Sequence, residues 1–265
     1  MDRLVVATDL SSRSDRALLR AAQLAGRFGC EWTILHVVDD DVPSVLVERV
    51  VSEVNDLLLA KAEKLADVAG QWPRVMVASG NVEETIIEVA RGLSAEVLMV
   101  GAHRRLELRQ LFLGSTSERV IRSSPIPVLR VGSANAPYER LLLALDLSPR
   151  SVDVLRTTRA LGLLEALHPM VLHAFVPGEG AEAQARRALR QFFRGQHVEF
   201  DDYQLLVAGE APLAIVGRLP LEVQPQLLAI GAPGRETSDN HMHGSVAVEL
   251  LRGLDCDILC VPPRG

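Results

Sequence analysis

The sequence predicts an α/β protein made of two repeated domains, each a five-stranded parallel sheet with helices on both faces. Three observations predict this fold. The chain has 265 residues, enough for two small domains. Short apolar runs alternate with amphipathic stretches, as in chains that form parallel sheets covered by helices. Similar segments also occur twice in the same order, which indicates an internal repeat.

The elements of the first copy follow one another without long gaps. Residues 3–9 are a continuous apolar run that ends in Thr-Asp, typical of a buried parallel strand. Ser11 or Ser12 can cap a helix that extends to about Phe28. The same alternation continues through strand 32–38, helix 44–69, strand 74–78, helix 82–93, strand 96–101, helix 115–123 and strand 127–131.

The repeat defines the predicted domains. Asp9 and Asp146 lie 137 residues apart in similar segments, LVVATDLS and LLLALDLS, and His36 and His173 have the same offset. Later landmarks are about 130 residues apart, so the second copy is about seven residues shorter between its second and third strands and has a shorter helix there, 180–195. The predicted domains are 1–132 and 139–265. The boundary is the small-residue, proline-containing segment 132–137, and the linker is placed at residues 133–138.

Glycines and hydroxyl residues suggest a phosphate cradle after the fourth strand of each copy. The second copy has the pattern G-x2-G-x9-G-S from Gly231 to Ser245, and the first copy has it with Arg104 at the middle position. Glycine lets the backbone approach an anion, and a helix N-terminus presents free N–H groups to it. With an aspartate at the end of the first strand to hold a sugar or base, the pattern predicts a nucleotide pocket.

These motifs resemble the nucleotide-binding signature of the universal stress protein family. The first copy reads GAHR…LFLGSTSERVI…PIPVL from Gly101 onward, and two copies in one chain resemble the tandem form of that family. The resemblance covers essentially the whole chain. It implies the universal stress protein fold, which is adenine-nucleotide alpha-hydrolase-like, ATP bound in some members and not in others, and domains that pair through their last strands.

The resemblance also implies site residues. Asp9 and Asp146 match the acid that contacts adenosine, and Val37 and Ala174 match the residue whose backbone faces the base. The remaining candidates form the phosphate loops: Gly101, Arg104, Gly114, Ser115, Thr116 and Ser117 in the first copy, and Gly231, Gly234, Gly244, Ser245 and Val246 in the second. The second copy keeps a glycine, Gly234, at the middle position where the first copy has Arg104. Because the backbone geometry of a glycine is hard to replace, the second copy is the favoured nucleotide site.

Simpler interpretations stay open for several of these residues. Asp9 and Asp146 can equally satisfy local backbone donors at a helix start. For His36 and His173, packing within apolar strands is favoured over catalysis, and for His241 and His243 a solvated loop is favoured over a metal site. The cysteines are expected to pack in the core, since no C-x-x-C occurs. No catalytic and no metal-binding residue is predicted.

Composition narrows the function. A net charge of -6 and 4% aromatic residues argue against nucleic-acid binding, and no apolar run is long enough to span a membrane. The sequence starts directly in a strand-like run, so a cytoplasmic location is expected. Neither G-x-S-x-G nor G-x4-G-K-[ST] occurs, so at most weak ATP hydrolysis is expected.

The leading hypothesis is a stress-response protein that binds ATP, with or without Mg²⁺, and acts as a sensor or regulator of a protein partner that the sequence does not identify. The alternatives are a nucleotide-free protein-interaction module with degenerate pockets and a slow ATPase. The apolar last strands, Val128–Val131 and Ile258–Val261, are expected to pair the two domains within the chain, and a homodimer is left open.

Overall fold

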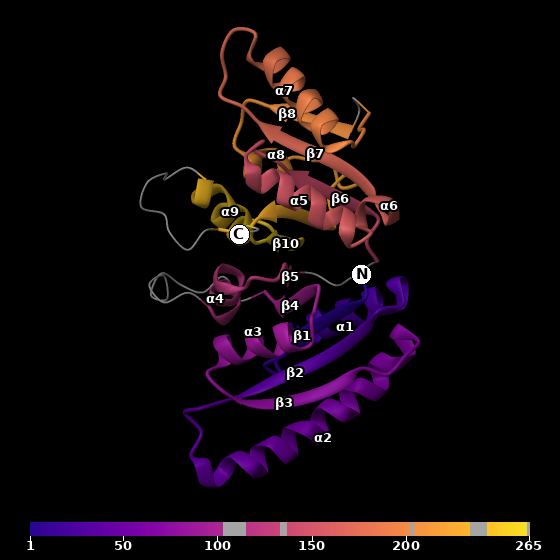
Figure 1. Cartoon of the computed structure of the whole chain (residues 1–265), viewed down its shortest axis with the longest axis vertical. Coiled ribbons are helices and arrows are strands. Elements are labelled where there is room, and N and C mark those ends of the chain that lie inside the picture. Colours follow the sequence, from indigo (N-terminus) through magenta and orange to yellow (C-terminus); the bar gives the residue numbers. More distant parts are fainter. Residues whose placement is uncertain (103–114, 133–136, 202–203, 234–242, 264–265) are drawn as a thin grey trace. The chain divides into compact units, whose positions relative to one another are not determined.

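The computed structural model of the chain describes residues 1–102, 115–132, 137–201, 204–233 and 243–263. It divides into two compact units, Met1–Pro137 (unit 1) and Tyr138–Gly265 (unit 2). Each unit is an α/β structure with its own parallel sheet (Figure 1). The α/β fold predicted from the alternation of strands and helices is confirmed.

The sheet of unit 1 has the strand order β3-β2-β1-β4-β5, and every neighbouring pair is parallel. Its central strand is β1, in which Val5 pairs with Thr33 on one side and Leu98 on the other. The strands are β1 (Arg3–Ala7), β2 (Glu31–Asp39), β3 (Arg74–Gly80), β4 (Val97–Gly101) and β5 (Val128–Val131). Strand β3 extends two residues beyond the end expected from its apolar run.

Four helices cover this sheet: α1 (Ser12–Phe28), α2 (Ser44–Ala69), α3 (Val82–Gly92) and α4 (Thr116–Ser123). Helix α1 packs against α2, and α3 packs against α4. The predicted cap at Ser11 is formed, since its side chain accepts a hydrogen bond from the amide of Ser14. Ser115, expected as the first residue of its helix, instead caps α4 by accepting a hydrogen bond from the amide of Glu118. Helix α1 ends at Gly29, whose φ of 62° suits glycine.

Unit 2 repeats this plan with the order β10-β9-β6-β7-β8, so that β6 takes the place of β1. Its strands are β6 (Arg140–Ala144), β7 (His168–Ala174), β8 (Leu205–Ala208), β9 (Leu227–Gly231) and β10 (Asp257–Val261). Its helices are α5 (Pro149–Ala160), α6 (Leu163–Ala166), α7 (Ala181–Gln196), α8 (Pro212–Gly217) and α9 (His243–Gly253). Helix α7 is the shorter helix expected in the second copy, and α6 is a single turn that the sequence pattern did not predict.

The core of each unit lies between the sheet and its helices. Leu4, Ile34 and Leu98 on the strands of unit 1, and Leu142 and Leu172 on those of unit 2, are almost fully buried. Central strands buried on both faces explain why their sequences read as continuous apolar runs rather than as alternating patterns. Unit 2 also buries a polar pair, in which the Tyr138 hydroxyl donates a hydrogen bond to Asp257 Oδ2 over 2.6 Å.

The strand order places a topological switch point in each unit. From β1 the chain moves to β2 on one side, whereas β4 lies on the other side; β6, β7 and β9 repeat this arrangement. In open α/β sheets, ligands bind outside the carboxyl ends of the strands at such a point. The residues that follow β1, β4, β6 and β9 therefore border the position at which such sheets bind ligands.

Candidate functional site

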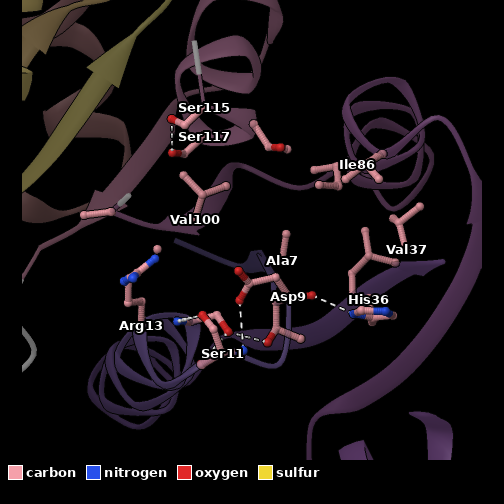
Figure 2. Close-up of a pocket in the computed structure, with 17 residues that line it drawn as sticks. Ala7, Asp9, Ser11, Arg13, His36, Val37, Ile86, Val100, Ser115 and Ser117 are labelled. Atoms are coloured by element: carbon pink, nitrogen blue, oxygen red, sulfur yellow. Dashed lines mark hydrogen bonds between the residues drawn. The ribbon is translucent and has the colours of Figure 1, made fainter. Parts of the chain in front are cut away.

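A cavity of about 320 Å³ opens at the carboxyl ends of β1 and β4 in unit 1 (the first pocket). Asp9 and Ser11 form one wall, Ser115 and Ser117 the facing wall, and His36, Val37 and Ile86 the side between them (Figure 2). Four segments that are far apart in the sequence thus meet at the switch point.

The turn between β1 and α1 is held by its own side chains. The Thr8 hydroxyl donates a hydrogen bond to Ser14 Oγ over 2.8 Å and accepts one from the amide of Leu10 over 3.0 Å. Asp9 Oδ1 accepts a hydrogen bond from the amide of Ser11 over 3.0 Å. The side chain of Asp9 therefore does satisfy a local donor, as the simpler interpretation proposes, and it also lines the pocket.

The pKa of the Asp9 carboxyl group lies below its ordinary value. Partial burial raises its pKa, but the hydrogen bonds from Ser11 and Ser14 have the larger combined effect and set the pKa below the ordinary 3.8. Asp9 is therefore a carboxylate at neutral pH, with lone pairs left to accept hydrogen bonds from hydroxyl groups of a ligand.

The same turn has an unusual backbone in both units. Leu10 has a φ of 63° and Leu147, which follows Asp146, has a φ of 62°. Left-handed backbone is unfavourable for leucine by about 1–3 kcal/mol, and such residues cluster where a site imposes its geometry. The turn that carries the aspartate therefore has the same strained backbone conformation in both units.

The facing wall is the N-terminus of α4. Ser115 caps this helix through its hydrogen bond from the amide of Glu118, and its Oγ also lies 2.9 Å from Ser117 Oγ. Thr116 lines the same wall. Three hydroxyl groups and the free N–H groups of a first helical turn are chemically suited to an anion.

Gly101 packs closely against α1 at the base of the pocket. A Cβ atom at this position would lie 3.2 Å from the carbonyl oxygen of Arg13 and 3.3 Å from Ser14 Cα. A side chain here would press on the backbone of α1, so glycine suits the close approach of β4 to the first turn of this helix. The close approach also brings Arg13 to the rim of the pocket, where its guanidinium group has no ion-pair partner among the described residues (Figure 2).

Strands β2 and β4 and helix α3 supply the apolar side of the pocket. Val37 is 7% exposed and, with Val82, Ile86 and Val100, forms a surface suited to a flat ring. The sequence favours a packing role for His36. The structure places it half-buried in the pocket lining, with Nδ1 2.8 Å from the carbonyl oxygen of Thr8.

Unit 2 has the corresponding cavity (the second pocket), of about 390 Å³. Asp146 Oδ1 accepts hydrogen bonds from the Ser151 hydroxyl over 2.7 Å and from the amide of Ser148 over 3.0 Å. His173 Nδ1 lies 2.8 Å from the carbonyl oxygen of Leu145, as His36 does from Thr8 in unit 1. The frame of the site is therefore duplicated.

The lining of the second pocket is more apolar. Leu145 takes the place of Thr8, Ala247 takes the place of Ser117, and Pro212 and Leu250 add further apolar surface. The guanidinium group of Arg150 makes a long hydrogen bond of 3.4 Å to the carbonyl oxygen of Ala232. Among the described residues, the first pocket thus offers more polar groups to a ligand.

The structure brings most of the sequence candidates together. The first pocket contains Asp9, Val37, Gly101, Ser115, Thr116 and Ser117, and the second contains Asp146, Ala174, Gly231 and Val246. Arg104, Gly114 and Gly234 lie outside the described residues, as does His241. For Gly244 and Ser245 the structure gives only their place in the first turn of α9.

Sequence reasoning missed the residues that the first turns of α1 and α5 contribute. Arg13 and Ser14 in unit 1, and Arg150 and Ser151 in unit 2, line the pockets. A signal for them exists, because both pairs are identical residues at the repeat offset of 137.

Two further features bear on function. The carboxylates of Asp39, Asp40 and Asp41 lie close enough together to share a cation, but all three are exposed, as expected for a turn.

Within the described ranges, the helices are all too short or too polar to cross a bilayer.

Comparison with known proteins gives a consistent result. Residues 1–132 match the sequence model of the "Universal stress protein family". The stress response protein NhaX of Bacillus subtilis is 28% identical over 161 residues, which cover 49% of this chain and 97% of that protein. A universal stress protein of Mycolicibacterium smegmatis is 25% identical over 288 residues and is matched along 98% of this chain and 97% of its own length.

Among solved structures, a universal stress protein from Archaeoglobus fulgidus superposes on 99% of this chain and 98% of its own chain with a TM-score of 0.78. At 18% identity this likeness shows the fold, including its two-unit extent.

Proposed function

Because the chain belongs to the universal stress protein family, we propose that it binds an adenine nucleotide, ATP, at the carboxyl ends of its strands and acts as a sensor or regulator in the stress response. The observation that carries the proposal is the duplicated frame. In each unit one cavity is lined by an aspartate on a strained turn, by a residue near the end of the following strand and by the last glycine of the fourth strand. These residues are Asp9, Val37 and Gly101 in unit 1, and Asp146, Ala174 and Gly231 in unit 2.

The two sides of the first pocket suit the two ends of a nucleotide. Asp9 is a carboxylate whose remaining lone pairs can accept hydrogen bonds from ribose hydroxyls. The apolar surface of Val37 and Ile86 suits a flat base. A ligand bound here spans from β1 to α4.

The phosphate end is the wall formed by Ser115, Thr116 and Ser117. Their hydroxyls and the N-terminus of α4 donate hydrogen bonds and carry a partial positive charge. Arg13 adds a full positive charge at the rim. No lysine lies in the described lining, so in this proposal the guanidinium group supplies the cation that a phosphate requires.

The two pockets are not equivalent in this proposal. The glycine pattern favours the second copy, whereas the described donors favour the first, where Thr8 and Ser117 replace Leu145 and Ala247. Occupancy of one pocket by nucleotide would connect the turn after β1 with α4 and so change the surface that a protein partner meets.

Calorimetric titration of the nucleotide-free chain with Mg-ATP tests the proposal. The wild-type chain should release or absorb heat with saturation, and the double variant Asp9→Asn, Asp146→Asn should bind at least about tenfold more weakly, since each change removes a charged acceptor. Asp67→Asn, an exposed position on α2, is the matched control and should bind as the wild type does. Absence of heat in a folded wild-type chain would reject the proposal and favour the interaction module.

A further inference from the structure

Two equivalent helices of the repeat carry opposite charge on their exposed faces. Helix α2 connects β2 with β3 in unit 1, and α7 makes the corresponding connection between β7 and β8 in unit 2. Each helix packs on the edge strand of the sheet in its own unit, α2 on β3 and α7 on β8 (Figure 1). Because the two helices occupy the same place in the same fold, the fold itself does not require them to differ in charge.

The exposed face of α2 is acidic. Its exposed charged residues are five acids and two bases: Glu48, Glu53, Asp56, Glu63 and Asp67, with Arg49 and Lys64. The Nε of Arg49 is already paired with Glu53 Oε1 over 2.8 Å. Asp56, Glu63 and Asp67 form no ion pair with a described residue. Since they are seven and four residues apart, they form one stripe along the helix, the acidic stripe.

The exposed face of α7 is basic. Arg187, Arg190 and Arg194 are exposed and follow one another at spacings of three and four residues, so they form a basic stripe. The single acidic residue of this helix, Glu182, is paired with Arg186 over 3.0 Å. The basic stripe therefore lies on a helix without a further acid to neutralise it, in a chain whose net charge is -6.

The charges on the two stripes match in spacing. Asp56 and Glu63 are seven residues apart, and so are Arg187 and Arg194. Seven residues are close to two helical turns, roughly 10 Å along the axis, and bring both side chains to the same side of a helix. Helix α7 laid along α2, in either direction, can thus place two guanidinium groups opposite two carboxylates at once.

Exposed apolar side chains accompany the acidic stripe. Of the nine large apolar residues that are exposed in the described part of the chain, five lie on α2 and none on α7. Among them are Leu57, 56% exposed, and Leu59, 44% exposed, which flank Asp56 in the sequence. The methylene stems of arginine cover apolar surface of this kind while the guanidinium group reaches a carboxylate.

The same observations favour a protein partner over a lipid surface for α7. A helix that lies in a membrane interface has arginines on one face and large apolar residues to insert on the other. The apolar residues Ala185, Leu189 and Phe193 of α7 are buried within unit 2, and no large apolar residue of this helix is exposed. An acidic helix with exposed leucines is the better counterpart, and α2 is such a helix.

We propose that α7 of one copy of this chain binds α2 of a second copy. In this contact Arg187 and Arg194 meet Asp56 and Glu63, and the arginine stems cover Leu57. The two surfaces differ, so the contact is heterologous, and every copy has one surface of each kind. Because the contact is one pair of helices and not a full interface of about 1,200–2,000 Å², we expect a weak and reversible association. It does not depend on the nucleotide proposal.

Sedimentation velocity of the full chain over a wide range of protein concentration tests the proposal. The sedimentation coefficient of the wild type should rise with concentration, and less so at high salt, which screens exposed charges. The basic reversal Arg187→Glu, Arg194→Glu and the acidic reversal Asp56→Arg, Glu63→Arg should each weaken self-association by at least about tenfold, since like charges then face each other.

Two controls separate the contact from a general effect of charge. Arg91→Glu, Arg122→Glu changes the net charge as much as the basic reversal does, at exposed positions on α3 and α4, and should associate as the wild type does. An equimolar mixture of the basic and the acidic reversal should recover the association that each has lost, because the charges across the contact are then complementary again. Circular dichroism confirms that each variant is folded.

Four results would overturn the proposal. They are a wild-type chain that stays monomeric at every concentration, an association that either reversal leaves unchanged, an association that the control variant loses as well, and a mixture of the two reversals that does not recover it. If the monomeric wild type instead binds vesicles of anionic lipid and the basic reversal abolishes that binding, the basic stripe serves a membrane surface and not a second copy.

Discussion

His36 Nδ1 donates a hydrogen bond to the carbonyl oxygen of Thr8 over 2.8 Å. A carbonyl oxygen only accepts, so the contact requires the hydrogen on Nδ1 of the imidazole. The bond connects strand β2, just before Val37, with the residue that precedes Asp9. Since His173 and Leu145 form the same contact in unit 2, this histidine braces the aspartate turn in both copies.

Replacing His36 should weaken nucleotide binding more than it destabilises the fold. His36→Ala removes the hydrogen bond to Thr8, and we expect a loss of about 1 kcal/mol in the free energy of unfolding. His36→Asn can return an N–H near Nδ1 and should recover part of the loss. Mg-ATP affinity should follow the same order, wild type, Asn, Ala; equal affinities would show that the brace does not position the site.

The acidity of Asp9 predicts how unit 1 responds to acid. The folded-state pKa lies below the unfolded value of 3.8, so the carboxylate stabilises the fold above that value, and the stabilisation is lost as pH falls through the folded-state pKa. Asp9→Asn should therefore flatten the loss of stability of unit 1 below about pH 4. Urea unfolding followed by tryptophan emission measures it, since both tryptophans lie in unit 1. If the loss of stability at low pH is the same in Asp9→Asn and the wild type, the hydrogen bonds that Asp9 accepts from Ser11 and Ser14 do not stabilise the fold.

Replacement by alanine should change the stability of unit 1 in opposite directions at Gly101 and Gly92. A Cβ at Gly101 would press on the backbone of Arg13 and Ser14, and overpacking of this kind costs about 1–3 kcal/mol. Gly92 ends α3 with open space around it, so Gly92→Ala should stabilise unit 1 by about 0.5 kcal/mol. Urea unfolding followed by tryptophan emission compares the two. Similar effects would mean that β4 and α1 do not approach as closely as described.

The cysteines should differ in reactivity. Burial raises the pKa of the Cys30 thiol to about 11, so that almost none of it is thiolate at neutral pH, and Cys260 is buried as well. Cys256 is partly exposed. A thiol reagent should label Cys256 in the native chain and all three cysteines after denaturation. Cys256→Ser should abolish native labelling; rapid labelling of Cys30 would show that unit 1 opens.

Much of the fold could be predicted because its signals are local. Ser11 and Ser115 are polar residues directly before periodic stretches, and both cap helices. The continuous apolar run of β1 reflects burial on both faces of a parallel sheet. Helix α6 was missed because Leu163–Ala166 is too short for periodicity to show.

The site was only partly predictable. Asp9 and Val37 follow parallel strands, so their convergence at one edge of the sheet follows from topology alone. Arg13 reaches the rim because Gly101 lets the helix approach the strand, a contact between segments that no local pattern reveals.

The nucleotide content of the purified chain shows whether the protein binds ATP. The protein is denatured, and the adenine nucleotide released is counted per chain by anion-exchange chromatography; any empty sites are then titrated with Mg-ATP. We expect one or two adenine nucleotides bound per chain at saturation, and fewer in the double variant Asp9→Asn, Asp146→Asn. A folded chain that carries no nucleotide and produces no heat with Mg-ATP would contradict it.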